Sequence, residues 1–147
     1  IADVFANNYL EKYKGVFSSC NKAFKLDSRF LSWCGECPKC AFVFLIFTPF
    51  VERSELEEIF SGKNLLLNPE LEQTYKELLG IEGSKPLECV GEIKESRSAM
   101  HMAFEKYPDL KEKYSFNLPE DYDYKKLESD EMPEEIKLSF ESWIKEF

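Results

Sequence analysis

The sequence predicts a mainly α-helical fold in which residues 1–147 form a single helical domain around a metal site of four cysteines. Three observations predict it. Apolar residues recur at a period of about 3.6, which is typical of helices packed on a core. No segment shows the alternation of apolar and polar residues that marks a half-buried strand. Four of the five cysteines are spaced as metal ligands are.

Composition and charge exclude several classes of function. Apolar residues make up 44% of the chain and aromatic residues 15%, so we expect a folded domain with a ring-rich core. The formal net charge of −9 repels nucleic-acid backbones and anionic lipid surfaces. We therefore expect neither nucleic acid nor a membrane among the partners.

The first 15 residues predict a helix, because their apolar residues follow the helical period. This segment has no targeting character, and the chain does not begin with methionine. We expect a cytoplasmic protein, and we favour the C-terminal piece of a longer chain over a processed protein. A loop is expected over residues 16–36, which hold the first two cysteines.

A helix is expected to begin at Pro38, because proline suits the first position of a helix, and to end near Pro49. Its sequence, KCAFVFLIF, is apolar all round. About 10 apolar residues cannot span a bilayer, which needs roughly 20. We interpret the segment as a central helix covered on every side. The alternative is that part of it faces a missing domain.

Helix signals also mark four later segments: after Arg53, from the Asn68-Pro69 cap to Gly80, over residues 92–107, and from Pro133 onward. Between them, residues 83–91 read as a loop, and residues 109–131 are acidic and weakly patterned. The residues expected to face the core are Leu56, Ile59, Phe60, Ile93, Met100 and Phe104. Leu71, Tyr75, Leu78 and Leu79 continue the helix that stops at Gly80, and Ile136, Phe140, Trp143 and Ile144 share one face of the last helix.

The cysteine pattern is Cys-x13-Cys-x2-Cys-x2-Cys, formed by Cys20, Cys34, Cys37 and Cys40. Zinc takes four thiolates at the corners of a tetrahedron, and two-residue spacers let neighbouring thiolates converge on one ion. Gly35 permits the turn that this convergence needs. Four thiolates leave no position for water, so the sequence predicts a structural zinc site rather than a catalytic one.

The negative charge of such a site needs partners. The helix that begins at Pro38 points its N-terminus at the last two thiolates, which favours their charge. Lys22 and Lys39 lie close to the cysteines in sequence and are expected to offset the remaining charge.

Other interpretations of the cysteines stay open. An iron–sulfur cluster can use Cys-x2-Cys-x2-Cys, but the ferredoxin run continues with a Cys-Pro four positions on, where this chain has Phe44. A cluster held by three cysteines is therefore an alternative. Disulfides favour pairs and an oxidising compartment, whereas the number of cysteines here is odd. Free buried thiols are the remaining alternative.

The loop of residues 83–91 is a second candidate site, although no residue of the chain can be assigned as catalytic. The backbone N–H groups at the start of the next helix can receive an anion, and Lys85 adds positive charge. We name Lys85, Glu88, Cys89 and Arg97 as candidate substrate-binding residues. The alternative is an ordinary connection in which Cys89 is a small buried hydrophobe.

Three stretches carry a family resemblance. SSCNKAF and SWCGECPKCAFVFLIFTPF, over residues 18–24 and 32–50, resemble the C-terminal part of the MurL family, as does KPLECVGEIKESRSAM over residues 85–100. This family consists of ATP-dependent UDP-N-acetylmuramoyl-L-alanyl-L-glutamate epimerases of peptidoglycan precursor synthesis. A looser likeness reaches the cyano-deazaguanine synthases of queuosine biosynthesis, in which a similar set of cysteines binds zinc beside a PP-loop ATPase core.

The resemblance implies that the chain is the C-terminal part of a larger α/β PP-loop-type enzyme. A nucleotide-binding domain with a Ser-Gly-Gly-type phosphate loop would precede Ile1, and ATP, magnesium and a UDP-linked peptide would be its ligands. The sequence here contains no glycine-rich phosphate loop of the usual forms, so we expect this chain alone to be inactive. The alternatives are a zinc-stabilised protein-interaction module without catalytic activity, or the C-terminal part of another PP-loop enzyme.

Overall fold

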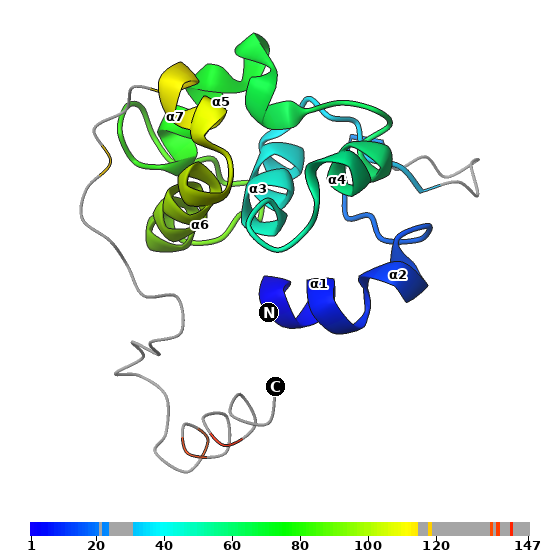
Figure 1. Cartoon of the computed structure of the whole chain (residues 1–147). Coiled ribbons are helices and arrows are strands. Elements are labelled where there is room, and N and C mark those ends of the chain that lie inside the picture. Colours follow the sequence, from blue (N-terminus) through cyan, green and yellow to red (C-terminus); the bar gives the residue numbers. More distant parts are fainter. Residues whose placement is uncertain are drawn as a thin grey trace.

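The computed structural model describes residues 1–20, 22–23 and 31–114, together with residues 118, 136, 138 and 142. Within these residues the regular elements are all helical and no strand is present, which confirms the predicted fold class (Figure 1). The α-helices are α1 (Ala2–Asn8), α2 (Leu10–Tyr13), α3 (Pro38–Phe47), α4 (Arg53–Ile59), α5 (Glu72–Leu78), α6 (Ile93–Lys106) and α7 (Pro108–Lys113), and the 3-10 helices are η1 (Leu65–Leu67) and η2 (Pro69–Leu71).

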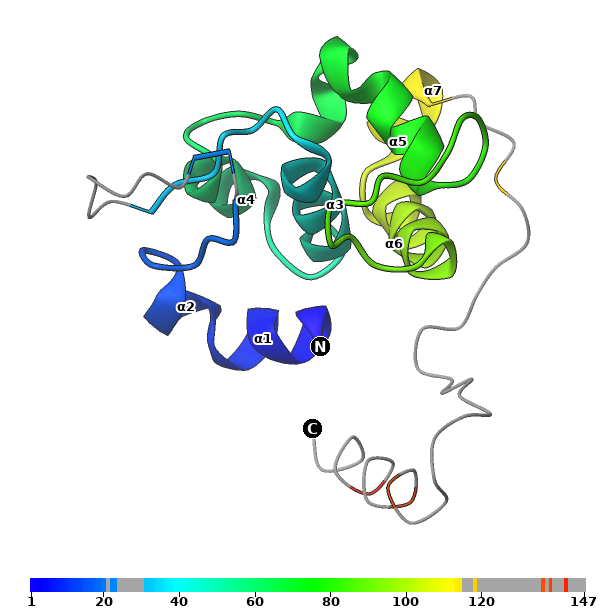
Figure 2. The ribbon, with the colours of Figure 1, turned by 180° about the vertical axis from the view of Figure 1, so that it is seen from behind.

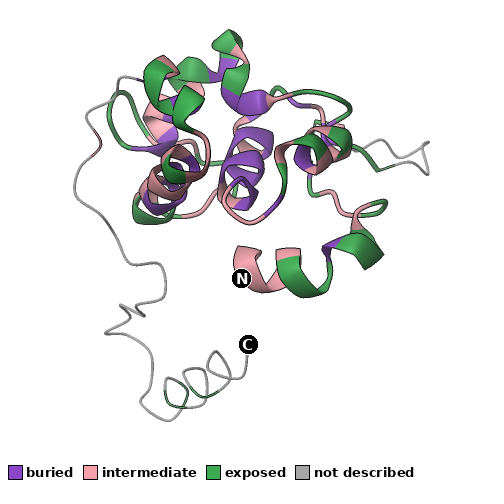
Figure 3. Ribbon diagram, in the orientation of Figure 1, coloured by how far each residue is buried: buried purple, intermediate pink, exposed green. Residues whose placement is uncertain are grey.

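Helix α3 is the centre of the fold. It begins with Pro38 and follows Cys37, which is in the extended conformation of a residue that precedes a helix. It packs against α1, α5, α6 and η1, and Figure 3 shows it buried along its length. This confirms the central helix expected from the sequence, and its apolar surface is not left exposed. Among the described helices, none combines the length and apolar character needed to cross a membrane.

The predicted N-terminal helix is interrupted, which corrects the expectation of one helix over residues 1–15. Tyr9 has φ −130° and ψ −18°, and this backbone conformation separates α1 from α2. The two short helices lie along one side of the body (Figures 1 and 2). Phe5 anchors them, with its ring centroid 5.0 Å from that of Phe17 and 5.9 Å from that of Phe47. Aromatic packing therefore fixes this segment more than its own periodicity does.

The middle helices follow the sequence closely. Asn68 caps η2 by accepting a hydrogen bond from the N–H of Glu70, so the predicted cap is confirmed, although the first turn after it is a 3-10 helix. Helix α5 ends at Leu78 with Leu79 as its cap, and Gly80 follows with a φ of +61°, which suits glycine just past a helix C-terminus. Leu56, Phe60 and Met100 are buried as predicted, whereas Ile59, Ile93 and Phe104 are only partly buried. Leu71, Tyr75, Leu78 and Leu79 are also buried.

Helix α7 was missed, because all of it after Pro108 lies in the stretch of residues 109–131, which is acidic and weakly patterned. Leu110 and Tyr114 are almost completely buried, and the hydroxyl of Tyr114 donates a hydrogen bond to the backbone oxygen of Leu66. Packing against a distant segment stabilises this helix, and a local pattern does not reveal such packing.

The predicted helix from Pro133 lies mostly outside the described residues, including Phe140, Trp143 and Ile144. Ile136, which the sequence places on one face of that helix with these three residues, is described, and 56% of its surface is exposed. A helical period shows which residues share a face, but it does not show whether that face meets the core.

Candidate metal centre

Four cysteine side chains converge beside the start of α3. The Sγ atoms of Cys20, Cys34, Cys37 and Cys40 all lie within 4.8 Å of one another, and all four cysteines are free. The Sγ of Cys40 is 3.6 Å from that of Cys34 and 3.4 Å from that of Cys37. A tetrahedron with metal–sulfur distances of about 2.3 Å has edges of about 3.8 Å. The spacing of the thiols therefore fits one metal ion.

The backbone between the cysteines explains the convergence. Gly35 has φ +71°, a left-handed conformation that side chains rarely adopt, and this confirms the predicted turn. The N–H of Glu36 then points back at the Sγ of Cys34, 3.4 Å away. Pro38 starts α3 immediately afterwards and brings Cys40 to the third position of the helix. One turn and one helix start thus place three sulfur atoms without long-range help.

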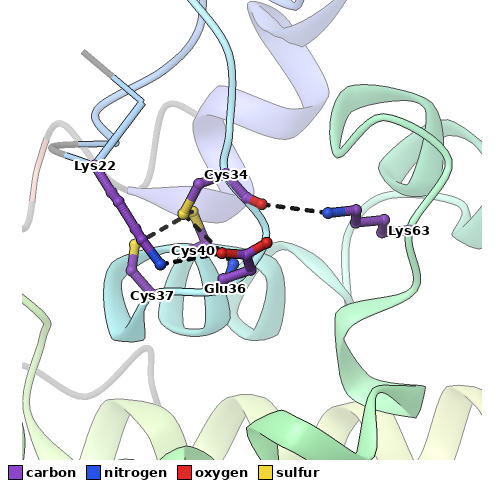
Figure 4. Close-up of polar contacts among 6 residues, drawn as sticks. All are labelled: Lys22, Cys34, Glu36, Cys37, Cys40 and Lys63. Carbon is purple, nitrogen blue, oxygen red and sulfur yellow. Dashed lines mark hydrogen bonds and ion pairs between the residues drawn. The ribbon is translucent and has the colours of Figure 1, made fainter. Parts of the chain in front are cut away.

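Cys20 arrives from a separate segment, and an ion pair joins that segment to the turn. The Nζ of Lys22 is 3.0 Å from a carboxylate oxygen of Glu36, as Figure 4 shows. Glu36 raises the pKa of Lys22, and smaller contributions come from the charges of Cys34 and Cys37. Lys22 is therefore close enough to the cluster to offset part of its charge, as the sequence predicts.

A second lysine, missed in the sequence, lies on the other side of the turn. The Nζ of Lys63 donates to the backbone oxygen of Cys34 at 3.4 Å (Figure 4). Its side chain also covers Gly35, where an added Cβ would lie 3.1 Å from the Cδ of Lys63. Lys63 is far from the cysteines in sequence, so no spacing rule points to it. Lys39, the other predicted cation, lines a hollow beside Cys20.

The four thiols are not equally easy to ionise. Burial raises the pKa of Cys37 and of Cys40, which is completely buried. Burial also raises the pKa of Cys20, but nearby N–H groups and thiols lower it more, and the result is about 7. A divalent cation supplies the charge that buried thiolates need, so metal binding is coupled to proton release.

A hollow adjoins the cluster on the side of Cys20, whereas Cys34 is the one partly exposed cysteine of the four. The hollow beside Cys20 has a volume of about 270 Å³, and a bound metal needs an entry path. The hollow is lined by Ser18, Ser19, Cys20, Ala23, Leu31, Ser32 and Lys39. Among the described residues, these four thiols form a closed donor set that can hold one metal ion.

The candidate substrate residues are less concentrated. The Nζ of Lys85 is 3.7 Å from a carboxylate oxygen of Glu92. Arg97 donates from Nε to the backbone oxygen of Leu79 at 2.7 Å, and from a terminal nitrogen to that of Gly80 at 3.3 Å. Arg97 therefore caps the C-terminus of α5, and the structure gives its side chain a role within the fold.

Glu88 and Cys89 are exposed in the same loop. Cys89 has φ +54°, which is uncommon for a residue with a side chain. The alternative interpretation of Cys89 as a small buried hydrophobe was therefore wrong. A turn places its side chain at the surface, where the local sequence gives no apolar partner.

Two carboxylate side chains of the protein itself cap the start of α6. The side chain of Glu95 accepts from the N–H of Glu92 at 2.7 Å, and the side chain of Glu92 accepts from the N–H of Glu95 in return. This capping box occupies N–H groups that the sequence analysis assigned to a ligand. Gly91 packs tightly beside it, since an added Cβ would lie 2.2 Å from a carboxylate oxygen of Glu95 and 2.5 Å from the Cζ of Phe42.

Comparison with known proteins decides the family. The family model of the MurL C-terminal domain matches residues 16–122, which include all four clustered cysteines and the loop of residues 83–91. The chain belongs to this family. The resemblance inferred from the cysteine motif and from residues 85–100 is thereby confirmed.

The relatives of this MurL C-terminal domain are named UDP-N-acetyl-alpha-D-muramoyl-L-alanyl-L-glutamate epimerase. The relative from Micromonospora sp. is 46% identical over 105 residues, or 71% of this chain and 23% of the relative. The relative from Salinispora tropica is 46% identical over 102 residues, covering 69% and 22%. The relative from Xanthomonas oryzae pv. oryzae is 46% identical over 92 residues, covering 61% and 20%. The matched part thus spans less than a quarter of each relative, and no solved structure matches the chain significantly.

Proposed function

We propose that this chain is the zinc-binding C-terminal region of an ATP-dependent epimerase that inverts the terminal glutamate of UDP-MurNAc-L-Ala-L-Glu in peptidoglycan precursor synthesis. The observation that carries the proposal is its 46% identity, over 71% of its length, to a protein with that name. On this proposal the chain works in a cytoplasmic polypeptide that also contains a nucleotide-binding domain with a phosphate loop.

The metal of this proposal is zinc. Four sulfur donors suit zinc, and a full set of four leaves no position for a water molecule, so the ion is structural. When bound, it fixes the segment of Cys20 against the turn of Cys34 and the first turn of α3. Metal analysis of the purified chain should give close to one equivalent of zinc. Iron with labile sulfide, or two disulfides without metal, would contradict this assignment.

The reaction needs an acidic α-proton on the glutamate. On this proposal the neighbouring carboxylate would attack the α-phosphate of ATP and release pyrophosphate, giving an acyl-adenylate in which the α-proton is far more acidic than in the free carboxylate. Removal and return of this proton on opposite faces would invert the carbon, and water would then hydrolyse the acyl-adenylate to the D-glutamyl product and AMP. The chain here would contribute the substrate side of the shared site, with Lys85, Glu88, Cys89 and Arg97 as the candidate contacts.

The test uses the longer polypeptide with ATP, magnesium and the UDP-linked L-alanyl-L-glutamate substrate. After acid hydrolysis of the product, chiral analysis of the freed glutamate should show the D form. ATP should be consumed in the same reaction. The chain of 147 residues, assayed alone, should produce neither. A longer polypeptide that keeps its zinc but inverts no glutamate would contradict the epimerase and would favour a zinc-stabilised interaction module.

A further inference from the structure

Exposed apolar side chains gather along α2 and the turn that follows it. Among the described residues, Tyr9 is 44% exposed, Tyr13 is 40% exposed and Val16 is 63% exposed. The N–H of Tyr13 donates to the backbone oxygen of Tyr9 at 3.1 Å, and the N–H of Val16 donates to that of Tyr13 at 2.9 Å. Successive turns of the backbone therefore place these three residues, which we call the α2 surface, on one side of the segment.

The α2 surface belongs to a neutral part of an acidic chain. Within residues 1–20, Asp3 and Glu11 balance Lys12 and Lys14, whereas the whole chain carries a formal charge of −9. A surface without net charge depends on its apolar area for binding. Tyrosine is enriched at the interfaces between proteins, so the residue types of the α2 surface suit a protein partner.

The helices that carry this surface have packing on one side only. Helix α1 has seven residues, none of them fully buried, and α2 has four, of which Leu10 is buried (Figure 3). Helices this short are marginal in water unless packing supports them. On the inner side Phe5 packs against Phe17 and Phe47, and its ring centroid is 6.4 Å from that of Tyr9. Tyr9 thus extends the inner aromatic cluster to the surface.

The family match indicates what covers the α2 surface. The model of the MurL C-terminal domain begins at residue 16, so α1 and α2 precede that domain and the α2 surface lies at its boundary. The matched part spans less than a quarter of each relative. A domain at the C-terminal end leaves most of such a polypeptide on its N-terminal side. That larger part joins the domain through α2, directly beside the exposed tyrosines.

We propose that the α2 surface is the docking face for the part of the longer polypeptide that precedes the C-terminal domain. This inference rests on the proposed function, which identifies that part as the nucleotide-binding domain. Docking would bury the three exposed side chains and give α1 and α2 packing on both sides. The ring of Phe17 also lies 5.3 Å from that of Trp33, the residue before Cys34, so the same aromatic cluster would connect the docked domain to the metal centre.

The test compares hydroxyl-radical labelling of this chain alone with labelling of the longer polypeptide. Hydroxyl radicals modify exposed side chains, and mass spectrometry locates the products. Tyr9 and Tyr13 should lose most of their labelling in the longer polypeptide. Leu67 of η1, which is 42% exposed, is the matched control and should keep its labelling.

Equal labelling of Tyr9 and Tyr13 in the two proteins would overturn the inference. Low labelling in both would mean that a second copy or another part of this chain covers the α2 surface. An equal loss at Leu67 would also overturn the inference, because the protection would then not be specific to α2.

A pair of variants separates docking from folding. In the longer polypeptide, Tyr13→Glu puts a charge into the proposed interface and should return the labelling of Tyr9 to its level in the chain alone. Leu67→Glu adds the same charge at a similar exposure and should leave Tyr9 protected. In the chain alone, both variants should keep the melting temperature of the wild type, because each changes an exposed side chain.

The docking face and the proposed function fail in different ways. A longer polypeptide that protects both tyrosines but inverts no glutamate would contradict the proposed function alone. One that inverts glutamate while both tyrosines are labelled as in the chain alone, or while Tyr13→Glu leaves Tyr9 protected, would contradict the docking face alone.

Discussion

The cysteine cluster and the loop of residues 83–91 differ in whether their side chains converge on one point. The four thiols come from two segments, meet within 4.8 Å of one another, and three of them are buried. In the loop, Glu88 and Cys89 are exposed and Lys85 contacts Glu92, the residue before α6, while Arg97 of α6 donates to the backbone oxygen of Leu79, just after α5. Side chains that converge on one point and have no other role in the fold are therefore stronger evidence for a bound ligand than the residue types in a loop are.

The largest expected difference between the two regions is in stability. Cys37→Ser removes a ligand from a site whose binding free energy contributes to folding, on the order of 10 kcal/mol in small zinc domains. Cys89→Ser changes an exposed side chain, and such changes usually stay within about 0.5 kcal/mol. If the proposed zinc is bound, thermal unfolding in the presence of zinc should therefore show a large fall in melting temperature for the first variant alone. Similar melting temperatures would contradict the metal assignment.

A substitution at Gly91 tests how tightly the end of the loop packs against α3. Gly91→Ala puts a Cβ against Glu95 and Phe42, and overpacking of this kind costs roughly 1–3 kcal/mol. Gly15→Ala is the matched control, because nothing lies within 4 Å of a Cβ at that position. Chemical denaturation should show a loss of stability for Gly91→Ala and almost none for Gly15→Ala. Equal stability of the two variants would mean that the loop is free to move away from α3.

A substitution at Lys85 tests whether the loop also binds substrate. The contact of Lys85 with Glu92 is at the surface, where an ion pair contributes about 0–1 kcal/mol, so Lys85→Ala should leave the melting temperature nearly unchanged. A lost hydrogen bond to a charged substrate group costs roughly 1.5 kcal/mol or more, which corresponds to about a tenfold rise in KM of the longer enzyme. Steady-state kinetics measure this rise, and unchanged kinetics would leave the loop as a connection.

The parts of the structure that were predictable depend on local chemistry. The helix at Pro38, its burial and the turn at Gly35 follow from residue types within a few positions of each other. The capping box of Glu92 and Glu95 is equally local but was missed, because its first residue is Glu rather than the Ser or Thr of the usual motif. These features need no knowledge of the rest of the chain.

The parts that were not predictable depend on distant partners. The break at Tyr9 interrupts a continuous helical period, because the aromatic contacts of Phe5 fix the orientation of α1. Helix α7 depends on burial of residues such as Leu110 against the body. The position of Lys63 over the turn likewise joins residues that no motif relates. Long-range packing decided each of these, and a single sequence does not encode it in a readable spacing.

The smallest expected effect concerns charge near the cysteines. Lys22→Met removes an ammonium group that pairs with Glu36 and lies near Cys34 and Cys37, so the four-thiolate site loses part of its compensation. Because the Lys22 side chain is 62% exposed, solvent screens much of the effect, and we expect zinc release to accelerate by about two- to fivefold at low salt.

Lys12→Met is the control, since it removes the same charge from α2, where the Nζ of Lys12 lies over the ring of Tyr13. Stopped-flow transfer of zinc to a chelator measures the rates. The difference between the two variants should disappear in roughly 1 M salt, where the screening length is about 3 Å. A difference that persists at high salt would show that Lys22 holds the Cys20 segment by packing, and equal rates at low salt would show that the cluster does not depend on this lysine.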